Sequence, residues 1–214
     1  MMLVSALCLS RGDQAMLDAA RADWDVQSPF CAAEYREFVV VVDEGSPVVV
    51  NGKRVEVPVG THLGKRRNIG LAACTGDVVA VWDDDDGHSP DRLAIQLEPL
   101  RAYRGYRCSF LQDLLLEFSD GHQAIGNFLA GWPQTLVAYK KDLIATGGWS
   151  ETATFDGDFE LLMRLQIAGR AFRVEHDRIL YRYRQHAANV TSAGHWAAIR
   201  TRSVPLEKAT WIHV

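Results

Sequence analysis

Two apolar, β-branched segments that each end abruptly in acid constrain the fold of this chain most strongly. "EFVVVV" stops at Asp43, and "DVVAVW" stops at the run Asp83–Asp86. Apolar runs of this kind are typical of strands that are buried on both faces, as in parallel sheets covered by helices. Segments with helical character, residues 13–24, 63–76 and 91–103, alternate with the strands. The pattern therefore predicts an α/β fold with a mostly parallel sheet.

Local signals predict where individual elements turn or stop. Asn51-Gly52 lies between two apolar runs and predicts a β-hairpin. Gly76 is expected to stop the helix over 63–76. Ser89-Pro90 is expected to supply the N-cap and the first-turn proline of the helix that follows. The second half is less regular, and its expected elements are a strand pair within 108–123, a strand and short helix within 134–144, a helix over 157–168 followed by Gly169, and strands within 173–186.

Length and composition favour one domain that spans residues 1–214. The chain is 48% hydrophobic and 23% charged, which is typical of a globular protein with a sizeable core. Its net charge of −4 gives no basic footprint, so no nucleic-acid partner is expected.

No stretch approaches the roughly 20 apolar residues that span a bilayer, and the apolar N-terminus predicts a strand rather than a signal peptide. The four cysteines lack metal-binding spacing and suit a reducing, cytoplasmic location. Homo-oligomerisation is left open.

The four adjacent aspartates, Asp83–Asp86, place several negative charges close together. Adjacent carboxylates repel one another unless a cation lies among them, and ligands of open α/β sheets bind at the carboxyl ends of strands. Carboxylates there suit a hard divalent cation, Mg²⁺ or Mn²⁺. The alternative is a solvated acidic turn that caps the next helix. A calcium-binding EF-hand loop is excluded, because with Gly87 as its sixth residue the first and twelfth positions are Trp82 and Leu93, which carry no carboxylate.

The segment "LGKRRNIGLAACTGDVVAVWDDDDGHSPDRL" resembles the central signature of family-2 glycosyltransferases. That signature runs from Arg-Asn-x-Gly through Gly-Asp, an apolar strand and an acidic DxD-type motif to Pro-x-(Lys/Arg)-Leu. "VSALCLSRGD" and "VVVVDEGS" resemble the first two strands of the family, "GGWSETATFDGDFELLMRLQIAG" its acceptor-side segment, and "YRYRQHAANVTS" its closing motif. The resemblance implies a GT-A-type three-layer sandwich with a nucleotide-sugar-binding half, residues 1–100, and an acceptor-binding half, residues 101–214.

The implied activity is that of an inverting glycosyltransferase. A sugar would move from a nucleotide diphosphate sugar (UDP-, GDP- or TDP-linked) to a saccharide or other hydroxyl acceptor by in-line displacement, assisted by Mn²⁺ or Mg²⁺. The resemblance makes Asp85 the first choice of metal ligand and Asp83, directly or through a water, the second. Asp84 is placed to meet the ribose or the metal shell, and Asp86 begins the following turn.

Four further residues are assigned to the donor side by the same resemblance. Asp43 corresponds to the position that contacts the nucleotide base, although a strand-end turn would also explain it. Arg67 corresponds to the arginine that faces the nucleotide, whereas its neighbours Lys65 and Arg66 are explained equally well as a solvated basic face. Ser10 and Arg11 line the nucleotide site at the end of the first strand, where the family usually has Pro-Thr-Tyr-Asn. The predicted hairpin replaces a helix that the family commonly has between Asp43 and Arg67.

Asp158 is the implied catalytic base. It aligns with the aspartate of the family's Glu-Asp pair, which deprotonates the acceptor hydroxyl, and Gly157 replaces the glutamate. The alternative is that Asp158 caps the helix that follows it, and Asp156 is the reserve candidate for the base. His186 matches a position near the metal and the phosphates, although a structural role is equally compatible with a single histidine.

Two other functions remain open. A metal-dependent sugar nucleotidyltransferase shares the layered architecture, but "LSRGDQ" is a poor version of its phosphate-binding loop. A catalytically silent sugar-nucleotide-binding module would lack a functional base, so Asp158 separates it from an enzyme.

Overall fold

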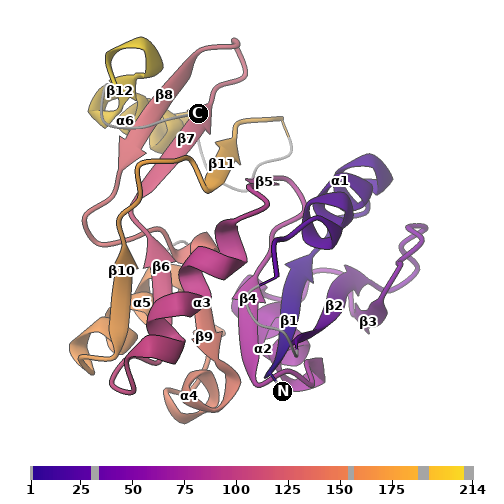
Figure 1. Ribbon diagram of the computed structural model, residues 1–214. Helices are drawn as coiled ribbons and strands as arrows, with labels where there is room; N and C mark the ends of the chain where they lie inside the picture. The colour runs from indigo at the N-terminus through magenta and orange to yellow at the C-terminus, as the bar shows by residue number, and fades with distance from the viewer. Residues whose placement is uncertain (1, 30–33, 154–156, 188–192, 210–214) are drawn as a thin grey trace.

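The chain forms two sheets with helices packed against them (Figure 1). The computed structural model describes all residues except 1, 30–33, 154–156, 188–192 and 210–214. The larger sheet has seven strands in the order β10-β6-β9-β4-β1-β2-β3. Its strands are β1 (Met2–Leu9), β2 (Glu34–Asp43), β3 (Lys53–Val57), β4 (Val78–Val81), β6 (Cys108–Leu111), β9 (Val137–Tyr139) and β10 (Ala171–Val174). Only β9 pairs antiparallel with its neighbours, so the predicted mostly parallel sheet is confirmed.

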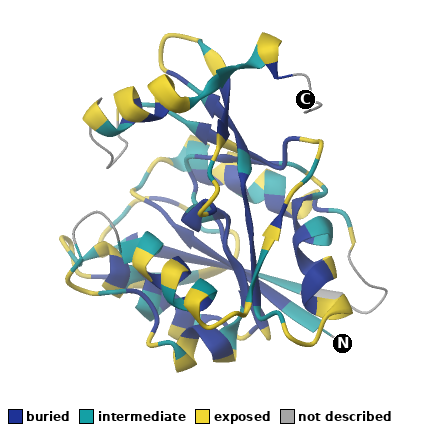
Figure 2. Cartoon of the chain, turned by 90° about the vertical axis from the view of Figure 1, so that its left-hand side faces the viewer, coloured by how far each residue is buried: buried dark blue, intermediate teal, exposed yellow. Residues whose placement is uncertain are grey.

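Helices cover both faces of the larger sheet, which gives a three-layer sandwich. They are α1 (Gln14–Asp25), α2 (Leu63–Ala73), α3 (Arg92–Ala102), α4 (Lys140–Ala145) and α5 (Gly157–Ile167). Apolar side chains of α1 and α3 pack on one face of β1, β2 and β4, and those of α2, α4 and α5 pack on the other. Figure 2 shows the result: the strands are buried, and the helices expose one side. The near-continuous apolar runs predicted this burial on both faces.

The second sheet has five strands in the order β12-β8-β7-β11-β5. They are β5 (Gly87–His88), β7 (Asp113–Glu117), β8 (Gln123–Asn127), β11 (Tyr181–Arg184) and β12 (Val204–Pro205), and α6 (Ala193–Arg202) packs on them. Short 3₁₀ turns lie at Pro133–Thr135 and Leu206–Lys208. The expected strand pair within 108–123 is not one pair, because β6 and β7 belong to different sheets.

Three local predictions were wrong. The segment that follows Asn51-Gly52 does not fold back as a hairpin but forms β3, which runs parallel to β2. Gly52 has φ +151°, and a Cβ there would lie 2.4 Å from the Phe38 carbonyl oxygen, so this glycine permits close backbone contact rather than a hairpin turn. Helix α2 ends at Ala73, before Gly76, which instead packs against β1. Helix α3 has Asp91 as its N-cap, so Ser89-Pro90 precede the helix.

Other local predictions were confirmed. The Asp13 side chain caps α1 by accepting from the Met16 N–H at 3.1 Å. Gly169 follows α5 with φ +66°, as expected for a helix-ending glycine. Cys8 and Cys74 are buried free thiols. None of the helices in the described residues is both long and apolar enough to cross a bilayer.

Candidate active site

Three neighbouring strand ends bring the predicted donor-side residues to one edge of the larger sheet. β4, β1 and β2 are adjacent and parallel, so their carboxyl ends point in the same direction. Ser10 follows β1, Asp43 ends β2, and Asp83–Asp86 follow β4. Ser10 is buried, and its N–H donates to the Val41 carbonyl at 3.0 Å, whereas Arg11 is exposed. This edge is where open α/β sheets bind their ligands.

Arg67 connects the acidic run to α5. It lies in α2 with 2% of its surface exposed, and its two terminal nitrogens donate to the two carboxylate oxygens of Asp83 at 3.1 and 3.2 Å. Its Nε lies 3.0 Å from Oδ1 of Asp158. Burial lowers the pKa of Arg67, but Asp158 and Asp83 outweigh burial and raise it above the ordinary value. A permanently charged guanidinium therefore holds two carboxylates from different elements in fixed positions.

Asp84 and Asp86 are largely buried and bound by neighbouring polar groups. Burial raises the pKa of Asp84 to about 7; a hydrogen bond with Ser10 opposes this rise, and the neighbouring aspartates add to it. Asp86 accepts hydrogen bonds from the Tyr181 hydroxyl and, at 3.1 Å, from the Arg184 backbone N–H. Burial raises the pKa of Asp86 as well, and the negative charge of Asp85 adds to this. Asp86 therefore fastens the acidic run to β11 rather than only beginning a turn.

Asp85 and His186 lie together, as expected for two ligands of one cation. His186 Nε2 is 3.0 Å from Asp85 Oδ2, although the two residues are far apart in the sequence. Burial, followed by the charge of Asp83, raises the pKa of Asp85, and His186 opposes the shift. Within the part of the chain that the structure describes, no three His, Cys, Asp or Glu side chains form a metal-binding group by themselves. A carboxylate with an imidazole beside it nevertheless fits Mn²⁺ or Mg²⁺, which are commonly held by one or two protein ligands together with substrate phosphates.

Asp43 is bound by Arg66. The Arg66 Nη1 donates to Asp43 Oδ1 at 2.5 Å, and Nη2 donates to the Ser10 carbonyl at 3.1 Å. The Arg66 side chain is 11% exposed, so it is not part of a solvated basic face, whereas Lys65 is exposed. One arginine of α2 thus joins the ends of β1 and β2.

Asp158 lies in the first turn of α5, which begins at Gly157, so it is not the N-cap of that helix. Besides its ion pair with Arg67, its Oδ2 accepts from the Gln134 amide at 3.5 Å. Its side chain is 13% exposed. The reserve candidate Asp156 lies outside the described residues.

A second buried arginine lies behind the acidic run. Arg92, at the start of α3, donates to Gln96 Oε1 at 2.9 Å and to the Val81 carbonyl at 3.1 Å, and it contacts His88 Nδ1. Its guanidinium lies 5.0 Å from the ring centre of Trp82. Burial lowers the pKa of Arg92 to about 10. The sequence places Arg92 at the Lys/Arg position of the family signature; the structure adds that it is fully buried and feels the charges of Asp83 and Asp86.

Some residues of the site were missed in the sequence. Arg66 was left as surface charge, and Gln134 and Tyr181 were not singled out, yet they bind Asp43, Asp158 and Asp86 respectively. For Tyr181 a signal existed, because the alternation "YRYR" places its tyrosines on one face of a strand and its arginines on the other.

Part of the chain matches a known protein family. Residues 38–123, somewhat under half of the chain, match the family model "Glycosyl transferase family 2". This part of the chain is similar to the family-2 glycosyltransferases. The matched residues include the end of β2 with Asp43, Arg67 and the whole acidic run, so the resemblance is confirmed for this segment, whereas Ser10 and Arg11 precede it. No curated protein sequence matches the chain.

Solved structures confirm the GT-A fold. S. aureus TarS (residues 1–349), in complex with UDP, has a TM-score of 0.68 at 14% identity, covering 86% of this chain and 61% of that one. Glucosyl-3-phosphoglycerate synthase from Mycobacterium tuberculosis, in complex with UDP, has a TM-score of 0.60 at 15% identity, covering 94% and 76%. The mannosyltransferase PcManGT from Pyrobaculum calidifontis, in complex with GDP-Man and Mn²⁺, has a TM-score of 0.61 at 15% identity, covering 92% and 60%. The chain thus spans about three fifths of the TarS and mannosyltransferase chains.

Proposed function

We propose that this chain is a nucleotide-sugar glycosyltransferase that acts by metal-assisted, inverting displacement on an acceptor hydroxyl. The observation that carries the proposal is the position of Arg67, which binds Asp83 of the acidic run and Asp158 of α5 at the same time. The two carboxylates to which the family assigns donor binding and acceptor activation are thereby held on either side of one guanidinium. The nucleotide-bound and nucleotide-sugar-bound relatives of the same fold support the donor class.

The reaction follows from these positions. The acceptor oxygen attacks the anomeric carbon, and the bond from that carbon to the diphosphate oxygen breaks, with its electron pair leaving on the nucleoside diphosphate. Asp158 takes the proton of the attacking hydroxyl, and attack opposite the leaving group inverts the anomeric centre. A divalent cation bound at Asp85 and His186 would neutralise the charge that develops on the diphosphate.

The remaining site residues fit supporting roles. Asp43 is placed to accept an N–H of the nucleotide base, with Arg66 fixing its orientation. Ser10 and Arg11 border the same edge, and Asp84 is held against Ser10. Gln134 steadies the base Asp158. Residues 1–100 supply most of the donor side, and residues 101–214 supply Asp158, Gln134 and His186, in keeping with a donor half and an acceptor half.

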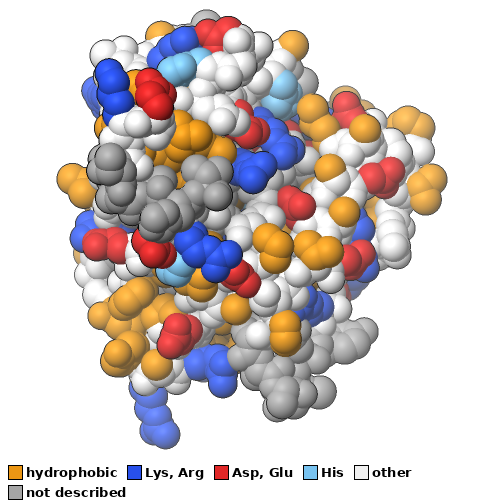
Figure 3. Space-filling model, turned by 45° about the horizontal axis from the view of Figure 1, so that its top comes forward, with side chains coloured by type: hydrophobic (Ala, Val, Ile, Leu, Met, Phe, Trp, Pro, Cys, Tyr) orange, Lys and Arg blue, Asp and Glu red, His pale blue; other side chains and the backbone are white. Residues whose placement is uncertain are grey.

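Partners and location follow from the same proposal. The acceptor is a saccharide or another hydroxyl compound. On the face that comes forward in Figure 3, acidic and basic side chains are interspersed, unlike the continuous basic surfaces that bind nucleic-acid phosphates. A cytoplasmic location stays a prediction from the unpaired, buried cysteines.

Donor binding is tested by calorimetric titration of the protein with UDP, GDP, TDP and CDP, with and without Mn²⁺. We expect one nucleotide to bind in a metal-dependent manner, and Asp85→Ala to lose that dependence. The matched control is Asp18→Asn, which removes an exposed carboxylate on α1. If no nucleotide binds under any metal condition, the proposal is wrong.

Catalysis is tested separately with Asp158→Asn and the nucleotide sugar that binds best. We expect the variant to bind the donor normally but to transfer or hydrolyse it about 10²- to 10⁴-fold more slowly, which is the usual contribution of a general base. Donor binding without turnover in the wild-type protein would identify a silent binding module. Formation of a nucleotide sugar from a nucleoside triphosphate and a sugar phosphate would identify a nucleotidyltransferase.

A further inference from the structure

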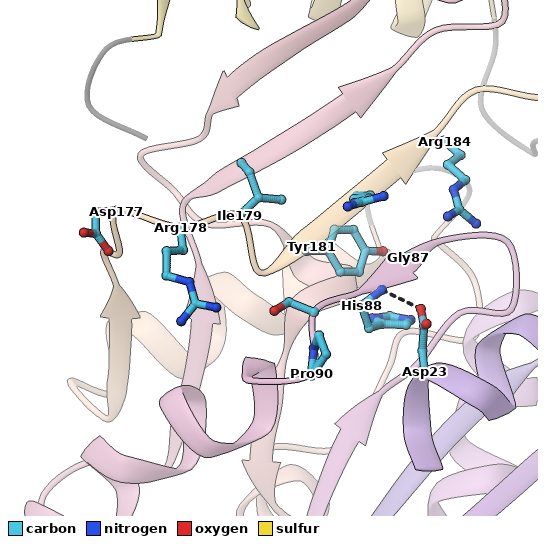
Figure 4. A pocket seen from close by; sticks show the side chains of 11 residues that line it. Asp23, Gly87, His88, Pro90, Asp177, Arg178, Ile179, Tyr181 and Arg184 are labelled. Atoms are coloured by element: carbon cyan, nitrogen blue, oxygen red, sulfur yellow. Dashed lines mark hydrogen bonds between the residues drawn. The ribbon is translucent and has the colours of Figure 1, made fainter. Parts of the chain in front are cut away.

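A cavity of about 590 Å³ lies beside β5, and none of the four aspartates of the acidic run lines it. It is enclosed by the end of α1, by β5 and the turn before α3, and by the loop that leads into β11. Figure 4 shows Asp23 and Asp177 near its opposite ends, with His88 and Tyr181 between them. Its volume is in the range of small-molecule sites. The donor site proposed above does not use it.

The β5–β11 ladder forms one wall of this cavity. Tyr181 pairs with His88, and Arg182 pairs with Gly87, in an antiparallel register. Tyr181 borders the cavity, and its hydroxyl donates to Asp86 of the acidic run. Because none of the four aspartates lines the cavity, we treat it as a second site that shares β11 with the proposed donor site.

Arginine supplies most of the charge on the cavity wall. Arg178, Arg182 and Arg184 line it together with two carboxylates: Asp23 accepts from the His88 N–H at 2.8 Å and is influenced by the charges of Arg184 and Arg182, and Asp177 lies 3.3 Å from His176. Burial lowers the pKa of His88 far below its usual value, which leaves this ring neutral.

The three arginines differ in how their charges are balanced. Arg178 lies 2.9 Å from Asp91, and Arg184 lies 3.1 Å from Glu117. Arg182 is exposed; its charge acts on Asp23, but its side chain makes no direct hydrogen bond or ion pair with any residue that the structure describes. Gly87 lies opposite Arg182 and in close contact with the arginines: a Cβ there would lie 3.0 Å from Arg184 Nη2 and 3.3 Å from Arg182 Cβ.

We propose that this cavity binds a small anionic molecule whose phosphate or carboxylate group is held by Arg182. A guanidinium binds either group through paired, charge-assisted hydrogen bonds. Pro90, which is exposed, and the edge of Ile179 offer apolar surface for the body of the ligand beside that charge. The site is independent of the donor site, so it does not depend on the glycosyltransferase assignment.

The test is a nuclear magnetic resonance titration that follows the backbone N–H signals of Gly87 and His88. Inorganic phosphate and succinate are added in turn, with sodium chloride at equal ionic strength as the reference. We expect saturable shifts with phosphate, succinate or both, and the response identifies which group the site takes. Arg182→Gln should weaken this binding by about tenfold or more, the loss expected for a hydrogen bond to a charged group. Arg104→Gln, which removes an exposed arginine elsewhere, should not weaken it.

The variant Arg11→Gln tests whether the added phosphate binds at the proposed donor site instead of in the cavity. If that variant loses the phosphate response while Arg182→Gln keeps it, the anion binds on the donor side and the proposal is wrong. It is also wrong if neither anion gives a saturable shift, because Arg182 is then simply a solvated arginine. The rest of the spectrum reports whether Arg182→Gln is folded, and the exposed position of this side chain favours a folded variant.

Discussion

Arg67 and Arg92 are both buried next to the acidic run, on opposite faces of the larger sheet, but their surroundings differ. Arg67 is bound by the carboxylates Asp83 and Asp158. Arg92 is bound by an amide, a backbone carbonyl and a histidine ring, and lies against Trp82 and Tyr181. The pKa of Arg67 is accordingly raised, and that of Arg92 is lowered to about 10.

The different partners of Arg67 and Arg92 indicate different roles for the two guanidinium charges. Two carboxylates around Arg67 would repel each other without it, so its charge is needed where the acidic run meets α5. Arg92 has no ion pair within the described residues, and its charge is desolvated at a cost. We therefore expect Arg67 to contribute mainly through ion pairing and Arg92 mainly through hydrogen bonds and packing.

The largest effect on stability is expected for Arg67→Gln. Removing one partner of a buried ion pair leaves an uncompensated charge, and here two carboxylates remain, so the free energy of unfolding should fall by about 3–5 kcal/mol. Urea denaturation at neutral pH measures this, with Glu98→Gln on the exposed side of α3 as control.

A double-mutant cycle with Asp158→Asn sharpens the result. The Asp158→Asn change should recover part of the loss in the Arg67→Gln background, because one of the repelling charges is gone. A loss below about 1 kcal/mol for Arg67→Gln would mean that the pair behaves like an exposed one.

A smaller effect is expected for Arg92→Gln. The substitution leaves the Val81 carbonyl without its donor, which costs about 1–3 kcal/mol, but it also removes a desolvated charge. The same urea experiment therefore should give a smaller loss than Arg67→Gln. An equal or larger loss would contradict the comparison and indicate that the charge of Arg92 stabilises the acidic run from behind.

Much of the fold and part of the site followed from sequence patterns. The apolar runs before Asp43 and Asp83 predicted buried parallel strands, and parallel strands necessarily bring their acidic ends to one edge. The family resemblance pointed to Arg67 and His186, and His186 lies beside Asp85, while the roles of these residues stay predictions. The strand predictions were confirmed because periodicity and strand direction are properties that neighbouring residues share.

What could not be predicted depends on contacts between distant segments. The Asn51-Gly52 signal describes a turn, but whether the next strand pairs parallel or antiparallel is decided by how the chain returns along β2. The partners of Asp86 lie in β11, about as far away in sequence as those of Asp85. Arg66 and Lys65 are adjacent and equally basic, and only the packing of α2 on the strand ends buries the first and exposes the second.

The smallest expected effect is that of replacing Arg66, compared with replacing its exposed neighbour Lys65 in α2. Arg66→Ala removes the donors to Asp43 and to the Ser10 carbonyl, and leaves Arg67 in place. With Asp43 as the proposed contact of the nucleotide base, we expect the KM for the nucleotide sugar to rise by about tenfold, because this carboxylate is no longer oriented, with little change in kcat. Lys65→Ala, on the same helix, should change neither quantity. A lower KM in Arg66→Ala would reverse the interpretation, because Arg66 would then compete with the nucleotide for Asp43 rather than prepare it. Either change in KM would distinguish Arg66, which orients Asp43, from its neighbour Arg67, which balances the charges of Asp83 and Asp158.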